Sequence, residues 1–172
     1  MAAGVDRSAP TKPPGEGKAR GESGSHGQTS EWGKERTLNI TINYLAVLIA
    51  AVITFVIGGL WYSPAMFGRR WMMAVGKTEE ECKKGNRSVA LIGAFVAALM
   101  MAYVLAIFIG FAQAKTIFQG VTIGLWSWVG FVAAPTLSNY LFSGWSRDLY
   151  LINNSYYLVS LLVMGAVLAM WT

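Results

Sequence analysis

Four long stretches of the chain contain no charged residue, and they constrain the fold more than any other feature of the sequence. They are Thr37–Gly68, Ser88–Ala114, Thr116–Ser146 and Leu149–Thr172. Each exceeds the roughly 20 apolar residues that cross about 30 Å of hydrocarbon as an α-helix, and buried helices of soluble proteins are rarely uncharged over such a length. In lipid, only helices and closed barrels satisfy the backbone, and these stretches lack the alternation of strands.

The sequence therefore predicts an all-α protein, an integral membrane four-helix bundle. We place its spans near residues 43–63, 89–112, 120–142 and 151–171, within a transmembrane domain of residues 37–172. Only 13% of the 172 residues are charged and 54% are hydrophobic, whereas a soluble domain has about 25% charged residues. The lipid bilayer is thus an expected partner, and nucleic acid is not.

Residues 1–36 differ sharply from the rest of the chain. They hold 11 of the 23 charged residues, together with 7 Gly, 3 Pro and 4 Ser. Such a segment buries too little apolar surface to offset its chain entropy, so we expect a disordered polar tail. It has neither the apolar core of a secretory signal nor the acid-poor composition of a mitochondrial transit peptide.

The longest connection between spans, residues 64–87, begins at Pro64, which is a natural helix stop. Beside two arginines, a large apolar residue then recurs at every fourth position, at Phe67, Trp71 and Val75. This spacing favours a short amphipathic helix in the headgroup layer, and an irregular loop with an interfacial aromatic residue is the alternative. Thr78 and Glu81 have the spacing of a helix capping box.

Basic residues near the spans predict the orientation in the membrane. The first and third loops contain seven of them, and the opposite face has three close to the membrane. The positive-inside rule therefore places loops one and three in the cytoplasm of a multi-pass protein of the cell (plasma or inner) membrane. Counting the whole tail makes the totals equal, seven against seven, and Lys34 and Arg36 beside the first span favour the reverse orientation.

The second span has a small residue at every fourth position. The members of this ladder are Ala90, Ala94, Ala98, Ala102, Ala106, Gly110 and Ala114. Small side chains let another backbone approach closely in lipid, so the ladder predicts a tight helix interface, either within the chain or between two copies. Shorter notches of the same kind occur in the third span (Gly120, Gly124) and in the fourth (Gly165, Ala169).

Neutral polar and aromatic residues gather on one membrane face, where the first and third spans end and the second and fourth begin. The candidate site residues are Trp61, Tyr62, Ser63, Thr136, Asn139, Arg147, Asp148, Asn153 and Tyr157, and the same face also collects Ser138, Tyr140, Asn154, Ser155 and Tyr156. This cluster predicts a site for a polar headgroup or a small neutral solute. Interfacial anchoring and interhelical hydrogen bonding are the structural alternative.

Pro135 lies inside the third span and frees the backbone carbonyl of Phe131 from its helical hydrogen bond. Hydroxyl groups or water re-satisfy such carbonyls, often beside a cavity.

Asp, Glu, Lys, Arg and His are absent from all four spans, so neither a proton relay nor intramembrane acid–base catalysis is expected. The chain has one cysteine, Cys82, and one histidine, His26, which excludes a disulfide framework and a haem or zinc site. We therefore expect no cofactor, no metal site and no catalytic residue. An enzyme acting on lipid headgroups through Arg147 and Asp148 has the least support, because two residues are too few to define a reaction.

Several motifs resemble those of a known family. They are Ile42–Val47, Gly58–Pro64 and Phe67–Gly68 with Trp71 in the first half, and Thr136–Phe142, Leu151–Asn153, Tyr157 and Met164–Gly165 in the second. In these residues the chain resembles the small, mostly bacterial membrane proteins catalogued as domain of unknown function 1761, over roughly residues 39–172. The resemblance implies a four-helix membrane protein and no particular activity, and the polar tail departs from the family's short start.

Two functions follow as hypotheses. The leading one is a non-enzymatic membrane protein that assembles through its small-residue helix faces, as a homo-oligomer or as an accessory subunit of another membrane protein. The alternative is a carrier or channel-like protein that binds a small solute or a lipid headgroup at the neutral polar cluster.

Overall fold

The computed structural model of the protein describes residues 41–84 and 86–171. All regular secondary structure in these two ranges is helical, and four helical segments are long and apolar enough to cross a membrane. These are Tyr44–Trp61 (α1), Arg87–Phe111 (α4), Ile117–Ser143 (α5, η1 and α6 in succession) and Arg147–Ala169 (α7). The predicted all-α four-helix bundle is confirmed. The predicted tail, residues 1–36, lies outside the described residues.

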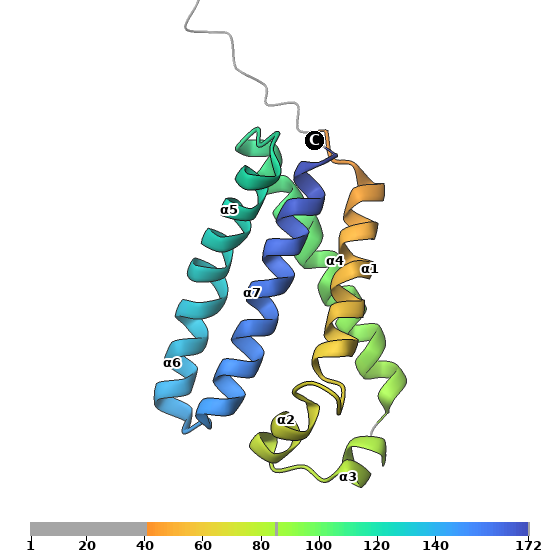
Figure 1. Ribbon diagram of the computed structural model, residues 1–172, viewed down its shortest axis with the longest axis vertical. Coiled ribbons are helices and arrows are strands. Elements are labelled where there is room, and N and C mark those ends of the chain that lie inside the picture. Colours follow the sequence, from red (N-terminus) through yellow and green to blue (C-terminus); the bar gives the residue numbers. More distant parts are fainter. Residues whose placement is uncertain (1–40, 85, 172) are drawn as a thin grey trace, which may run out of the picture. The chain divides into compact units, whose positions relative to one another are not determined.

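The four long segments alternate in direction along the chain, and each overlaps one of the predicted spans (Figure 1). Two short helices, Gly68–Val75 (α2) and Glu79–Lys84 (α3), connect α1 to α4. They lie at the end of the bundle where α6 ends and α7 begins. We call this the α2 end.

Side-chain caps fix where the long helices begin. Asn43, Ser146 and Thr116 precede α1, α7 and α5, and each side-chain oxygen accepts a hydrogen bond from a backbone N–H of the first turn. Gln119 completes a reciprocal capping box with Thr116. Because the first N–H groups of a helix have no acceptor within it, these residues define the helix starts locally.

Both helices that the sequence suggests for the α1–α4 connection are present. The apolar repeat near Phe67 forms α2, so the helical reading is correct and the irregular loop is not. The Glu81 carboxylate accepts hydrogen bonds from the backbone N–H (2.9 Å) and the hydroxyl (3.0 Å) of Thr78 and thereby caps α3. These bonds, the backbone one foremost, hold the pKa of Glu81 below its usual range.

The core is built largely from small residues. α1 packs on α4, and their buried alanines are Ala46, Ala50, Ala51, Ala98 and Ala102. Along the predicted ladder, Ala98, Ala102 and Ala114 are buried, Ala106 and Gly110 are half-buried, and Ala90 and Ala94 are exposed. The middle and the end of the ladder are therefore used within one chain.

α5 and α7 make the most extensive helix contact in the described chain, and it lies at the two glycine notches. A Cβ atom added to Gly120 would overlap the carbonyl oxygen of Gly165, and one added to Gly165 would overlap that of Gly120. One turn along, Gly124 lies in the same way against the carbonyl of Leu161. The two backbones touch directly, which only glycine permits at these positions.

Gly165→Ala is expected to lower the free energy of unfolding by about 1–3 kcal/mol, because the added methyl group must displace a backbone segment. Gly93→Ala is the matched control, since nothing lies within 4 Å of its Cβ position and alanine favours a helix by up to about 1 kcal/mol over glycine. Circular dichroism in mild detergent gives the melting temperatures. Equal melting temperatures for the two variants would contradict the direct backbone contact.

Candidate functional site

Two tryptophans on different helices donate hydrogen bonds to backbone carbonyls of α7. Trp61, the last residue of α1, donates its indole N–H to the carbonyl of Ile152 at 3.1 Å. Trp128, the last residue of α5, donates to the carbonyl of Asn154 at 2.9 Å. Both carbonyls belong to turns of α7 near its start. The two indoles therefore hold this part of α7 between α1 and α5.

Asn154 connects α7 to the third apolar segment. Its side chain is 5% exposed. Its Oδ1 accepts a hydrogen bond from the hydroxyl of Thr136 (2.9 Å), and its Nδ2 donates to the carbonyl of Tyr150 (3.0 Å). Both polar ends of the buried amide thus have partners, as burial of an amide requires.

Asn153 contacts α1 instead. Its Oδ1 accepts a hydrogen bond from the hydroxyl of Tyr62 at 3.0 Å. The Tyr62 ring also contacts the rings of Trp71 and Tyr156, with centroids 5.7 and 5.3 Å away, and Tyr156 contacts Tyr157 at 5.2 Å. An unbroken series of four aromatic rings therefore runs from α2 to the middle of α7.

The third apolar segment changes its geometry beside Asn154. A π-helical turn, Val129–Ala133 (η1), separates α5 (Ile117–Trp128) from α6 (Ala134–Ser143). The N–H of Ala134 donates to the carbonyl of Val129, one residue further back than in an α-helix. The Thr136 hydroxyl lies 2.6 Å from the carbonyl oxygen of Val132 and 2.9 Å from Asn154 Oδ1, so its one hydrogen is shared between these two acceptors. This carbonyl lies four residues before Thr136 and is not the Phe131 carbonyl that the sequence predicts to be freed by Pro135.

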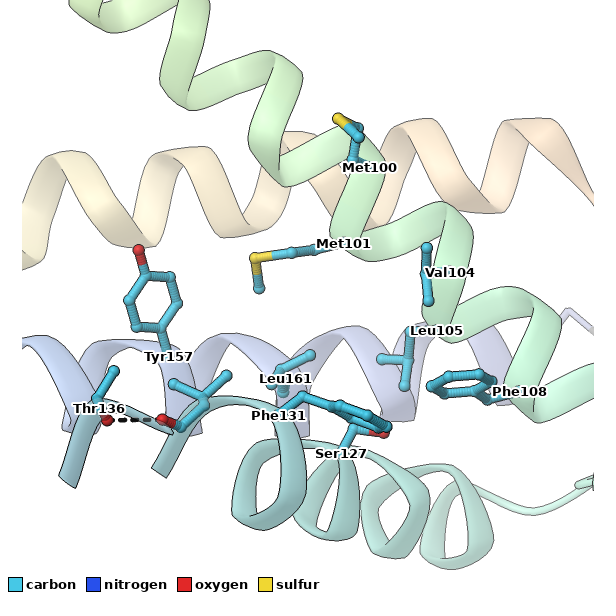
Figure 2. Close-up of a pocket in the computed structure, with 11 residues that line it drawn as sticks. Met100, Met101, Val104, Leu105, Phe108, Ser127, Phe131, Thr136, Tyr157 and Leu161 are labelled. Carbon is cyan, nitrogen blue, oxygen red and sulfur yellow. Dashed lines mark hydrogen bonds between the residues drawn. The ribbon is translucent and has the colours of Figure 1, made fainter. Parts of the chain in front are cut away.

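A groove of about 550 Å³ opens beside this turn, between α4, the η1–α6 segment and α7 (Figure 2). Its volume falls within the roughly 300–1,000 Å³ that is typical of ligand sites. The apolar lining consists of Met100, Met101, Val104, Leu105, Phe108, Phe131, Val132 and Leu161, and the polar lining consists of Ser127, Thr136 and Tyr157. Thr136 and Tyr157 lie at one end of the groove and Phe108 at the other.

Two hydroxyl groups on the groove lining are unbonded. Ser127 is 9% exposed, and neither its hydroxyl nor that of Tyr157 makes a hydrogen bond within the described ranges. Among the residues that the structure describes, no Asp, Glu, Lys, Arg or His lines the groove. Met100 and Phe131 at its rim are 65% and 71% exposed, so the groove opens on the outer surface of the bundle at mid-helix.

The structure divides the predicted polar cluster. Trp61, Tyr62 and Asn153 join in contacts between α1 and α7, and Thr136 and Tyr157 line the groove. Ser63 is bonded locally, because its hydroxyl donates to the carbonyl of Leu60 at 2.7 Å.

Three members of the predicted cluster, Asn139, Arg147 and Asp148, are exposed, and their side chains make no hydrogen bond or ion pair with any residue that the structure describes. Within residues 41–84 and 86–171, no three side chains of His, Cys, Asp or Glu lie close enough together to hold a metal ion. We therefore assign no metal site to the described residues.

Trp128 is a site residue that is not among those predicted from the sequence. A usable signal exists, because Trp128 follows Gly120 and Gly124 at four-residue spacing and therefore lies on the face of α5 that packs on α7. The α4 side chains of the groove carry no such signal, because they are ordinary apolar residues of a membrane-compatible helix.

Asn154→Ala is expected to lower the free energy of unfolding by about 1 kcal/mol, because two side-chain hydrogen bonds of about 0.6 kcal/mol each are lost in an apolar interior. Asn139→Ala is the control, since its exposed side chain makes no such bond. Thermal unfolding in the same detergent compares them. Equal effects of the two substitutions would show that Asn154 is not a structural link.

Comparison with models of protein families identifies the family. A family model described as "Protein of unknown function (DUF1761)" matches residues 45–169. No curated protein and no solved structure matches the chain. The matched range begins in the first turn of α1 and ends with α7, so it includes the indole contacts, Asn154 and the groove. The chain therefore belongs to the DUF1761 family of proteins of unknown function, as its sequence motifs suggest.

Proposed function

We propose that this protein is an integral membrane protein that binds an uncharged, lipid-like molecule in the groove beside the π-helical turn. The observation that carries the proposal is the combination of apolar walls, a volume of about 550 Å³ and two unbonded hydroxyl groups. Sites for small apolar molecules have this character, because apolar walls supply affinity and a few polar groups fix the orientation.

The outer surface of the bundle supports its placement in a bilayer. The shortest of the four apolar segments, α1, has 18 residues, which at 1.5 Å per residue span about 27 Å. Large apolar side chains are exposed along its outer face, among them Leu45, Val52, Val56 and Leu60. A continuous apolar surface of this kind is unfavourable in water. The basic residues of the two loops at the α2 end support a cytoplasmic location for that end in a cell membrane.

The groove favours a neutral ligand, because no charged side chain lines it and an ion would be unpaired at that depth. Ser127 and Tyr157 each offer a hydroxyl hydrogen, which matches a carbonyl or hydroxyl oxygen on the ligand. The exposed rim residues support entry directly from the hydrocarbon. A long-chain molecule with one oxygen-bearing group meets all three conditions.

Binding without chemical conversion is part of the proposal. The groove supplies hydroxyl groups, and its lining contains no carboxylate, imidazole or thiol that could act as a general base at neutral pH. Arg147 and Asp148 are exposed at the start of α7 and are not joined to the groove by any hydrogen bond among the described residues.

Val104→Trp is expected to abolish binding, because Val104 lines the groove and an indole would occupy it. Val56→Trp is the matched control, since Val56 is similarly exposed (54% against 45%) and does not line the groove. Native mass spectrometry of protein extracted gently from its host membrane is the measurement, with the released lipids identified. The unaltered chain and Val56→Trp should carry a neutral lipid that Val104→Trp lacks.

Two results would reject the groove as the binding site. Either Val104→Trp carries the same neutral lipid, or the unaltered chain carries no neutral lipid. Ser127→Ala refines the result and should weaken retention about five-fold, the equivalent of one hydrogen bond of about 1 kcal/mol.

A second candidate function is assembly with another copy or with another membrane protein through the first turns of α4. The observation that favours it is the exposure of the small residues Ala90, Gly93, Ala94 and Ala97. A Cβ atom on Gly93 would meet nothing within 4 Å. Ala90 and Ala94 are the part of the ladder that the chain's own bundle leaves exposed, and Gly93 and Ala97 lie beside them. Surfaces of small residues let a second helix approach closely.

Ala90→Leu combined with Ala94→Leu is expected to shift an oligomer to monomer in bilayers, because the larger side chains keep the helices apart. Val96→Leu is the control on the same helix, where an exposed large side chain is already present. Cross-linking in reconstituted membranes measures the oligomer fraction. An unchanged fraction in the double variant would remove this candidate.

A further inference from the structure

α2 is held firmly against the bundle. The ring of Phe67, which precedes α2, lies 4.9 Å from that of Trp61, and the ring of Trp71 lies 5.7 Å from that of Tyr62. Gly68 packs so closely on the turn after α1 that an added Cβ atom would overlap the carbonyl oxygen of Tyr62. The helix is therefore fixed relative to the end of α1.

The opposite face of α2 is exposed and combines positive charge with apolar groups. Arg69 and Arg70 are exposed. Neither arginine forms an ion pair with an acidic side chain that the structure describes. Met66 and Met73 beside them are 50% and 73% exposed. Two exposed arginines are thus close in sequence to two exposed methionines.

The charge of the surrounding loops favours an anionic partner. Within residues 41–171, the α2 end contains seven basic residues against four acidic ones. The basic residues are Arg69, Arg70, Lys77, Lys83, Lys84, Arg87 and Arg147, and the acidic ones are Glu79, Glu80, Glu81 and Asp148. The opposite end, where α4 turns into α5, contains Lys115. The local excess of positive charge is therefore a property of one end of the bundle.

We infer that the exposed face of α2 binds the headgroups of anionic phospholipids. α2 follows the turn after Trp61, the last residue of a membrane-length helix, so its arginines lie at the level of the lipid phosphates. Guanidinium groups bind phosphate oxygens through paired hydrogen bonds, and the exposed methionines insert at the boundary of the acyl chains. The inference rests on the proposed transmembrane placement of the bundle and not on the groove ligand.

The test uses the full-length protein in bilayer nanodiscs that contain equal amounts of phosphatidylglycerol and phosphatidylcholine. Native mass spectrometry after release measures the ratio of the two lipids that remain bound. Arg69→Gln and Arg70→Gln should each lower the phosphatidylglycerol ratio about five-fold, the effect of about 1 kcal/mol per basic residue at an anionic surface. Arg69→Lys should retain most of the preference, and Lys115→Gln, at the opposite end, should leave it unchanged.

Three results would overturn the inference. They are a ratio that does not change in either glutamine variant, a ratio that falls equally in Lys115→Gln, and displacement of the bound lipid by a soluble acidic protein. Melting temperatures of all variants verify that each one is folded. Val104→Trp should keep the phosphatidylglycerol preference, so failure of the groove proposal is seen separately. Failure of the transmembrane placement would instead prevent the unaltered chain from entering the nanodisc.

Discussion

The direct contact between the backbones of α5 and α7 at Gly120 and Gly165 determines how the rest of the bundle is arranged. With a side chain at either position, the two helices would move apart by the width of a methyl group or more. Trp128 would then no longer reach the carbonyl of Asn154, and Thr136 would no longer reach its side chain. The polar contacts near the α2 end therefore follow from a packing contact that itself contains no polar side chain.

The π-helical turn and the groove have a common origin in this arrangement. Pro135 removes one backbone donor, and the extra residue of the turn absorbs the change while the helix continues as α6. The Phe131 ring lies 6.0 Å from that of Phe108 on α4, and Phe131 and Val132 line the groove. A local backbone irregularity thus lies beside the groove, and π-turns are frequent at functional sites.

Much of the fold follows from the sequence because long apolar segments without charge obey simple rules. Charge-free length predicts the four helices, and the glycine notches predict two close-packed faces, although not that these faces meet each other. From the sequence, the small-residue ladder fits a contact within the chain or between two copies. The structure buries Ala98, Ala102 and Ala114 in the core of one chain and leaves Ala90 and Ala94 exposed. The groove has no sequence signature, because it depends on the divergence of α4 from α6 and not on any unusual residue. Asn139 and Asn154 show the same limit of sequence-based prediction. Both are asparagines on the predicted polar face, but Asn154 is buried and Asn139 is exposed.

The exposure of Met100, Val104 and Phe131 at the rim of the groove means that its entrance is lateral. In a bilayer the groove would never be empty, because acyl chains of the surrounding lipid are present at nearly molar concentration. A ligand must then compete with the surrounding lipid for the groove. A dissociation constant measured relative to water would describe this competition poorly. The relevant quantity is the equilibrium constant for exchange of a bulk lipid by the ligand, expressed in mole fractions of the membrane. Hydrogen bonds from the hydroxyl groups of Ser127 and Tyr157 would make this constant differ from one.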